Sequence, residues 1–140
     1  MHCGVRQGCP ISPLLFAAVV DVLLRMLEKR LPSGVFKAVA DEIGAVNDDW
    51  HACVDTLRKT FTEFEEMSGL ALNIDKTVCI PLWENAGNDI QNSVAGSSWD
   101  GLAVASHATY LGVEQGPGKG NHSWDKPTRK FLGRCQKWAV

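Results

Sequence analysis

The residues best suited to chemistry are two adjacent carboxylates, Asp41 and Glu42, in the stretch KAVADEIGAV. The apolar runs VFKAVA and IGAVN flank them and favour a tight β-hairpin with the carboxylates at its tip. An Asp at such a turn is often only a turn former, whose short side chain bonds the local backbone. Two carboxylates beside apolar strand residues also repel each other unless a cation lies between them, and their oxygens suit Mg²⁺, with Mn²⁺ as an alternative. The pair therefore indicates either a plain turn or a metal site for phosphoryl chemistry.

A second stretch with chemical potential is GVRQGCPISP, residues 4–13. Gly8 permits close backbone approach, and Arg6 and Gln7 offer donors for phosphate or base edges. Pro10 stiffens the entry to the helix that follows. A turn followed by a helix cap explains the same residues, so composition alone leaves both interpretations open.

Other metal or nucleotide chemistries find little support. The segment GVEQGPGKG, residues 112–120, hints at a phosphate-binding loop, but five residues rather than four precede its Gly-Lys pair and Gly120 replaces the required Ser or Thr. The five cysteines are far apart and form no C-x-x-C pair, which is typical of reduced thiols rather than of a zinc site. We therefore expect neither a P-loop nor a zinc centre.

Charge is nearly balanced overall, at −2, but it is unevenly distributed. Residues 41–100 contain 12 acids and 3 bases, whereas residues 119–140 contain 6 bases and 1 acid. This uneven charge distribution is consistent with an acidic metal-binding region and a basic tail that contacts phosphates. Charged, solvated helix faces would give the same pattern. The bases available for nucleic-acid binding in the tail are Arg129, Lys130, Arg134 and Lys137.

The longest apolar run, LLFAAVV at residues 14–20, is far short of the roughly 20 residues that cross a membrane. No positively charged leader or small-residue cleavage site frames this run. We expect an intracellular protein, nuclear or cytoplasmic, that is neither secreted nor embedded in a membrane.

The first half of the chain predicts a helix, a hairpin and a second helix. Ser12 is a good N-cap, and Pro13 suits the first position of a mostly buried helix over residues 13–30. NDDW opens a second helix that ends at Gly69. The first helix has one polar stripe, Asp21, Arg25 and Glu28, and the second has one apolar stripe, Trp50, Val54, Leu57, Phe61, Phe64 and Met67.

The second half predicts short strands, loops and a final helix. LALNI and TVCIPL form two strands joined through Asp75 and Lys76, and a mobile, polar loop follows over residues 84–101. LAVASHATYLGV is extended, GPGKGNHS is a flexible link, and KPTRKFLGRCQKW begins a third helix. The order predicts an α+β fold, with an antiparallel sheet and helices packed on one of its faces.

Four blocks in this order, GVRQGCPISPLLF, VADE, FEEMSGLALNIDKT and YLGV, resemble the palm of reverse transcriptases encoded by non-LTR retrotransposons. They extend over residues 4–113. The resemblance implies a partial polymerase palm over residues 1–113, and a linker followed by the start of a helical thumb over residues 114–140.

The resemblance also implies roles for individual residues. Asp41 and Glu42 become the catalytic, metal-binding carboxylates, and Lys76 becomes a basic residue that assists departure of pyrophosphate. The expected nucleotide and template pocket contains Arg6, Gln7, Gly8 and Pro10, and the expected primer-grip region contains Tyr110, Leu111 and Gly112. The implied activity is RNA-directed DNA polymerisation by two metal ions, Mg²⁺ or Mn²⁺, on an RNA template with a DNA primer and a deoxynucleoside triphosphate.

The chain departs from the family pattern in two ways. The family has an earlier strand with another metal-binding Asp upstream of the GVRQG block, and it has a second Asp where this chain has Glu42. We therefore expect the chain to be inactive by itself. Decay of a mobile element would explain both departures, and a truncated gene model would explain the first. The alternatives are a non-catalytic RNA-binding remnant and a product without a selected function.

Overall fold

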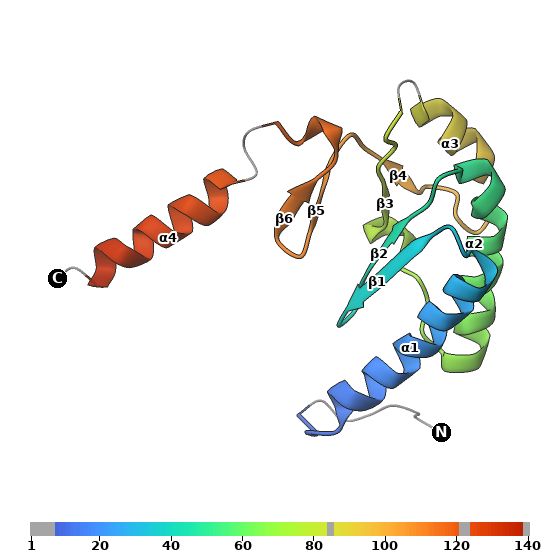
Figure 1. Cartoon of the computed structure of the whole chain (residues 1–140), viewed down its shortest axis with the longest axis horizontal. Coiled ribbons are helices and arrows are strands. Elements are labelled where there is room, and N and C mark those ends of the chain that lie inside the picture. Colours follow the sequence, from blue (N-terminus) through green and yellow to red (C-terminus); the bar gives the residue numbers. More distant parts are fainter. Residues whose placement is uncertain (1–7, 84–85, 121–123, 139–140) are drawn as a thin grey trace. The chain divides into compact units, whose positions relative to one another are not determined.

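The computed structural model describes residues 8–83, 86–120 and 124–138, which form mixed helices and small sheets (Figure 1). The chain divides between Asn73 and Ile74 into two compact units. The described residues contain four α-helices and three two-stranded sheets. None of the described helices is both long and apolar enough to cross a membrane.

The first helix, α1, contains Ser12–Arg30 and has Pro13 in its first turn, as predicted. The N-cap is Ile11, which makes no side-chain cap bond, so the prediction of Ser12 as N-cap is wrong. A turn precedes the helix, in which the backbone N–H of Ser12 donates to the carbonyl oxygen of Cys9 at 3.1 Å. Because this turn already curls the chain, helical geometry begins one residue earlier than the cap pattern indicates.

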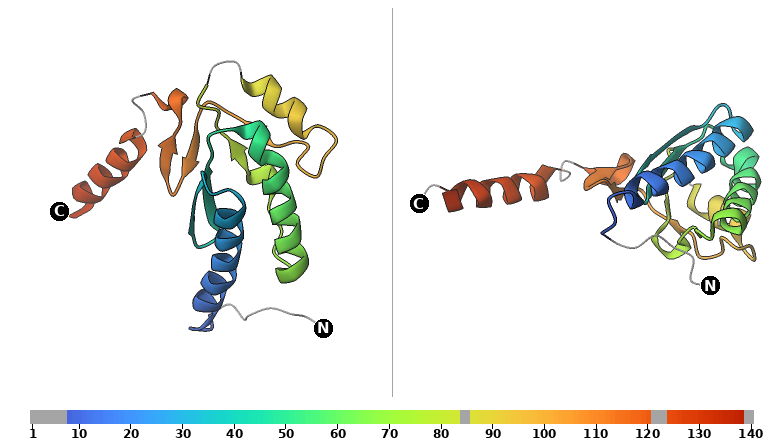
Figure 2. Two further views of the ribbon diagram at one scale, coloured as in Figure 1. Left: turned by 45° about the vertical axis from the view of Figure 1, so that its right-hand side comes forward. Right: turned by 90° about the horizontal axis from the view of Figure 1, so that it is seen from below.

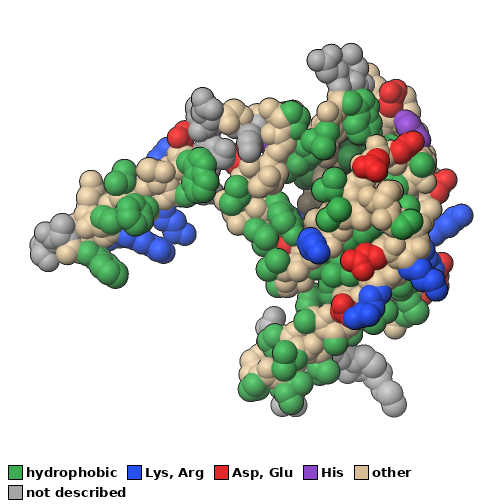
Figure 3. Space-filling view, viewed as in Figure 1, with side chains coloured by type: hydrophobic (Ala, Val, Ile, Leu, Met, Phe, Trp, Pro, Cys, Tyr) green, Lys and Arg blue, Asp and Glu red, His purple; other side chains and the backbone are tan. Residues whose placement is uncertain are grey.

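Most of α1 is not buried, which corrects the prediction of a mostly buried helix. Its buried residues are Val20, Leu23 and Leu27, which lie on one face at spacings of three and four. Leu14 remains 71% exposed, and hydrophobic side chains gather over the first half of the helix in Figure 3. Only one narrow face is buried because, among the described residues, α1 packs mainly against α2 and β1 (Figure 2).

The predicted hairpin is present. Strands β1, Val35–Val39, and β2, Glu42–Val46, pair antiparallel. The last pair of the ladder joins Val39 to Glu42, so the turn contains only Ala40 and Asp41. The hairpin therefore places the acidic pair at its tip, as the sequence predicts.

Helix α2, Trp50–Ser68, begins and ends as predicted. Asp49 is the N-cap, and its carboxylate accepts a hydrogen bond from the backbone N–H of Ala52 at 3.1 Å. Gly69 has a left-handed φ of +72° and donates its N–H to the carbonyl oxygen of Glu65 at 2.7 Å. Both ends thus follow from local chemistry.

The buried face of α2 differs slightly from the predicted stripe. It consists of Cys53, Val54, Leu57, Thr60 and Phe64. Met67 was expected on this face but is 64% exposed, because it lies at the edge of the face in the last turn of the helix. Phe36 of β1, only 2% exposed, adds an aromatic side chain to the core of the same unit.

A polar contact joins α1 to α2 at the end of α1. The guanidinium of Arg30 donates to the hydroxyl oxygen of Thr60 at 3.0 Å and to the carboxylate of Glu63 at 2.6 Å. The hydroxyl of Thr60, which is fully buried, in turn donates to the carbonyl oxygen of Thr56 at 2.7 Å. The contact fixes the position of one helix along the other.

The segment around the boundary between the two units differs from the prediction. The LALNI segment is not a strand, and Ile74–Lys76 instead form a short 3₁₀ helix, η1. Strand β3, Val78–Cys79, is short and pairs in parallel with β4, Ala103–Val104. The prediction of a strand from LALNI fails because a short apolar run does not by itself determine secondary structure, and none of residues 70–74 is buried.

The predicted mobile loop over residues 84–101 is wrong, because it contains helix α3, Ala86–Val94. Ala86, Ile90 and Val94 lie four residues apart and are all buried. Trp99 and Leu102 follow the helix and are also buried, at 7% and 4% exposed. The many Asn, Ser and Gly residues between these positions make the segment polar in composition. Its few apolar residues nevertheless form one buried face, which stabilises a short helix.

Strands β5, Ala108–Tyr110, and β6, Val113–Gln115, form an antiparallel hairpin. The predicted flexible link after it contains a second 3₁₀ helix, η2, Pro117–Lys119, and Gly118 donates its N–H to the carbonyl oxygen of Ser106 at 2.9 Å. A Cβ at Gly118 would lie 2.2 Å from the Ser106 hydroxyl oxygen, so this close approach requires glycine. The last helix, α4, Asp125–Trp138, is present as predicted.

The mixture of helices and small sheets agrees with the predicted α+β class. The predicted antiparallel sheet is not continuous, because the strands of the described residues form three separate pairs, two antiparallel and one parallel. The pair of β3 and β4 is parallel because α3 lies between the two strands and returns the chain to the same end.

We expect Arg30→Met to lower the free energy of unfolding by about 1 kcal/mol, because it removes two hydrogen bonds to a buried hydroxyl and a carboxylate. Chemical denaturation measures the change. Arg25→Met is the matched control, since its ion pair with Asp21 at 2.6 Å is exposed and is worth roughly 0–0.5 kcal/mol. Equal losses in the two variants would contradict the assigned role of Arg30.

Candidate active site at the carboxylate hairpin

The two carboxylates lie next to each other at the end of the β1–β2 hairpin. Asp41 is the second residue of the turn and Glu42 is the first residue of β2, and both are exposed. Because both residues are exposed, a divalent ion in solution can reach them. The donor set therefore fits Mg²⁺, which commonly takes one or two protein carboxylates and completes its shell with water or substrate.

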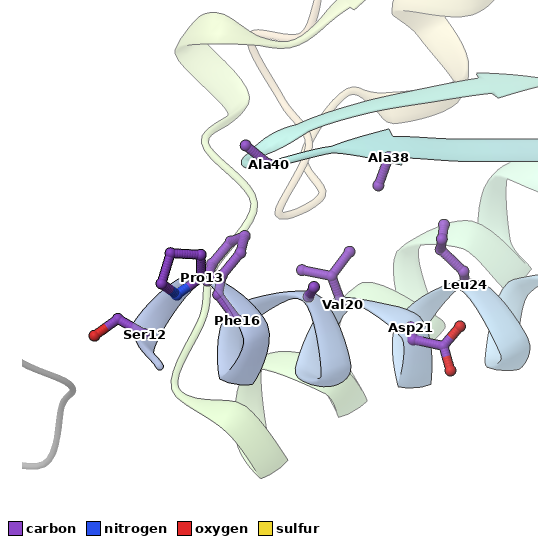
Figure 4. A pocket seen from close by; sticks show the side chains of 9 residues that line it. Ser12, Pro13, Phe16, Val20, Asp21, Leu24, Ala38 and Ala40 are labelled. Atoms are coloured by element: carbon purple, nitrogen blue, oxygen red, sulfur yellow. The ribbon is translucent and has the colours of Figure 1, made fainter. Parts of the chain in front are cut away.

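The same hairpin approaches the start of α1. A pocket of about 570 Å³ lies between them and is called the α1–hairpin pocket here; its lining consists of Ser12, Pro13, Phe16, Ala17, Val20, Asp21, Leu24, Ala38 and Ala40. Phe16, Val20 and Leu24 point from α1 toward the hairpin, and Ala38 points back toward the helix (Figure 4). The GVRQGCPISPLLF and VADE blocks, which are distant in the sequence, thus meet beside Asp41.

The lining of the α1–hairpin pocket is mostly apolar. Asp21 points away from the hairpin in Figure 4, and its carboxylate accepts a hydrogen bond from Arg25 at 2.6 Å. That guanidinium neutralises the carboxylate, and Asp21 in turn raises the pKa of Arg25 through the same hydrogen bond. The pocket therefore adds no third metal-binding carboxylate to Asp41 and Glu42.

The turn before α1 holds the described part of the predicted nucleotide and template pocket. Gly8 has a φ of +89°, which glycine adopts without strain, and Pro10 follows it in an exposed turn. Between them, Cys9 has a lowered pKa because its thiolate accepts hydrogen bonds from the backbone of Ile11 and from the side chain of Ser12. Arg6 and Gln7 lie outside the described residues.

The remaining predicted site residues belong to the second unit. Lys76 is the last residue of η1 and is exposed. Tyr110 is half-buried at the end of β5, and Leu111 and Gly112 form the turn to β6, with φ of +51° and +78°. YLGV is therefore a hairpin tip rather than a continuous strand.

The basic tail residues share one helix. Arg129, Lys130, Arg134 and Lys137 lie on α4 and are all exposed. Lys130, Arg134 and Lys137 are spaced by four and three residues, which places them on one face of the helix. Lys and Arg side chains gather along one side of α4 in Figure 3.

The chemistry that the described residues provide at the hairpin is limited to its carboxylate pair. Among residues 8–83, 86–120 and 124–138, no group of three or more His, Cys, Asp or Glu side chains is arranged to hold a metal ion. The cysteines in this part of the chain, Cys9, Cys53, Cys79 and Cys135, form no disulfide bonds, and of these four only Cys53 is buried.

Comparison with known proteins identifies the family. The model of the family described as reverse transcriptase (RNA-dependent DNA polymerase) matches residues 1–133. The chain belongs to the reverse transcriptase family. This confirms the resemblance on which the sequence interpretation of Asp41 depends, although the match assigns no role to any single residue.

Two curated relatives of this reverse transcriptase chain are Pol polyproteins of R2 retrotransposable elements. One, from Popillia japonica, is 33% identical over 95 residues, which are 60% of this chain and 13% of the relative. The other, from Drosophila melanogaster, is 39% identical over 80 residues, which are 52% of this chain and 7% of the relative. The matches therefore span a small part of the relatives' length. No solved structure matches the chain.

Sequence reasoning missed two features of the reverse transcriptase hairpin. Ala40, next to Asp41, has a φ of +51°, although residues with a Cβ seldom adopt this conformation. Nothing in the letters VADE signals it, because such a turn usually contains Gly, Asn or Asp at this position. The α1–hairpin pocket was also missed, since it depends on how two segments pack and not on either one alone.

Proposed function

We propose that this chain forms part of an RNA-directed DNA polymerase and that its β1–β2 hairpin supplies ligands to the catalytic metal site. The observation that carries the proposal is the exposed, adjacent placement of Asp41 and Glu42 at a hairpin tip in a chain of the reverse transcriptase family. On this proposal, residues 1–113 belong to the palm, and residues 114–140 are a linker and the first helix of the thumb.

The proposed chemistry is nucleotidyl transfer assisted by two metal ions. Mg²⁺ or Mn²⁺, when bound by these carboxylates, would supply activation of the primer 3′-hydroxyl and neutralisation of the charge on the departing pyrophosphate. Asp41 holds the ion through its short side chain, which the turn projects into solvent. Glu42 adds a second negative charge, but its extra methylene displaces its oxygens from the positions that a strict octahedral shell requires. Asp41 is therefore the more important of the two ligands.

Other residues act on the substrates in this proposal. Arg6, Gln7, Gly8 and Pro10 line the pocket for the template and the incoming deoxynucleoside triphosphate, and Tyr110, Leu111 and Gly112 contact the DNA primer. Lys76 assists the departure of pyrophosphate by donating a proton or by balancing its charge. The RNA template pairs with the incoming nucleotide.

A two-metal site needs more carboxylate oxygens than one hairpin provides. Asp41 and Glu42 are neighbours in the chain, so they approach a pair of ions from one side only. The family resemblance assigns the opposing Asp to a strand before the GVRQG block. We therefore propose that these 140 residues bind a metal ion weakly and do not polymerise without that additional strand.

A second candidate function is RNA binding without catalysis, which the basic face of α4 favours. Lys130, Arg134 and Lys137 share one exposed face of the helix, and Arg129 lies beside it. Rows of exposed cations with this spacing bind the phosphate backbone through release of counterions, without regard to base sequence. This activity would survive the loss of polymerisation, because it needs neither Asp41 nor a metal ion.

Mn²⁺ bound at the hairpin should broaden the amide NMR signals of residues 40–42 in the ¹⁵N-labelled chain. We expect Asp41→Asn to weaken the apparent affinity for Mn²⁺ about tenfold and Glu42→Gln about threefold, because each removes one charged ligand. Asp48→Asn, at the opposite end of β2, is the matched control and should leave the affinity unchanged. Broadening that Asp41→Asn does not reduce would contradict a metal site at this hairpin.

Primer extension tests the proposed need for a further strand. The purified 140-residue chain, with Mg²⁺, an RNA template, a DNA primer and deoxynucleoside triphosphates, should give no extended product. A chain extended at its N-terminus by the upstream strand with its Asp should recover activity, and Asp41→Ala should abolish that activity. Product from the 140 residues alone that disappears in Asp41→Ala would show that the hairpin needs no opposing carboxylate.

RNA binding by α4 should depend steeply on salt. We expect the chain to bind single-stranded RNA with a log–log salt slope of roughly −3 if about four phosphates are neutralised, measured by fluorescence anisotropy. Replacing Arg129, Lys130, Arg134 and Lys137 of α4 by Gln should remove most of this slope. The control replaces Arg25, Lys29, Lys37 and Lys59 by Gln, which changes the net charge equally; the same loss in both variants would exclude a specific role for α4.

A further inference from the structure

The turn that contains Asp41 holds a residue in an unfavourable backbone conformation. Ala40, the first residue of the turn, has a φ of +51°, and Leu111 is the only other non-glycine residue with a positive φ in the described part of the chain. This conformation brings the Cβ of an L-residue too close to the backbone, so glycine is the usual occupant. The fold therefore holds Ala40 against its intrinsic preference.

Side-chain packing does not impose this conformation. Ala40 is exposed, and it lines the α1–hairpin pocket of about 570 Å³, which leaves the tip without close-packed neighbours on the α1 side (Figure 4). The constraint comes from the ladder, because Val39 pairs directly with Glu42 and leaves only two residues to reverse the chain. The backbone of the turn itself thus determines where Asp41 lies.

We propose that Ala40 is a positioning residue for Asp41, an inference that rests on the proposed metal-binding role of the hairpin. The methyl group of Ala40 restricts the turn to few conformations, and the ladder selects the one with a positive φ. Asp41 then projects from the tip in a narrow range of directions. Glycine at position 40 would accept the same φ without strain but would also accept several others, so Asp41 would be spread over more orientations.

This role predicts opposite effects on stability and on metal binding. Ala40→Gly relieves the unfavourable φ, so the hairpin ladder should be at least as stable as before. The same change lowers the fraction of molecules with Asp41 in the orientation that binds metal, and the apparent affinity falls by that fraction. A residue that merely supports the hairpin would lower both quantities together.

The experiment measures both quantities on the full 140-residue chain labelled with ¹⁵N. Mn²⁺ titration, followed by broadening of the amide signals of residues 40–42, gives the affinity, and hydrogen exchange of the β1–β2 ladder gives the local stability. We expect Ala40→Gly to weaken Mn²⁺ binding about threefold to tenfold while ladder exchange becomes no faster. Ala45→Gly is the matched control, because Ala45 lies in the same hairpin, is exposed and has no positive φ.

The control should behave in the opposite way. Ala45→Gly should speed ladder exchange about twofold to fivefold, because glycine weakens a strand interior, and should leave Mn²⁺ affinity unchanged. Unchanged Mn²⁺ affinity in Ala40→Gly would overturn the positioning role and leave the proposed function intact. Faster exchange in Ala40→Gly, matching that of Ala45→Gly, would also overturn it. Wild-type chain that binds no Mn²⁺ through Asp41 would overturn the proposed function and this inference with it.

Discussion

The packing of α1 against the hairpin and α2 is the interaction on which the candidate site depends. Leu23 and Leu27 of α1 and Phe36 of β1 are at most 2% exposed, and their apolar area supplies most of the energy that fixes the hairpin. Arg30 fixes the alignment of α1 relative to α2, because its two hydrogen bonds to α2 form in only one alignment of the helices. A hairpin of two strands is marginal in water by itself, so the carboxylates are positioned only because this core supports them.

The sequence predicted those parts of the fold that local chemistry determines. Helix α2 begins within NDDW and ends at Gly69 as expected, with Asp49 as its N-cap, because a carboxylate cap and a left-handed glycine act within a few residues of chain. The hairpin followed from two β-favouring runs around an acidic turn. The placement of Asp41 and Glu42 at its tip was predictable for the same reason, since register in a short hairpin is fixed by its turn.

Features that depend on contacts between distant segments were not predictable in this way. Helix α3 lies in a stretch whose polar composition suggested a loop, and its burial requires a surface formed elsewhere in the second unit. The parallel pairing of β3 with β4 likewise depends on the crossover through α3. Leu14 was expected to be buried but is exposed. Apolar periodicity indicates which helix face can be buried, but it does not indicate whether another segment packs against that face.

Solvent exposure of the two carboxylates limits how strongly the hairpin by itself attracts a divalent ion. Charges in water attract a divalent ion only weakly, because the dielectric constant is high and salt screens them. If the proposed function holds, a nucleic acid and a nucleotide over the tip would exclude water and bring phosphate oxygens that complete the shell of the ion. Metal binding and substrate binding would then be coupled, and by linkage each would strengthen the other equally. The proposed positioning role of Ala40 would matter most in this situation, because a ligand already held in place loses little entropy when the ion and the phosphates arrive together.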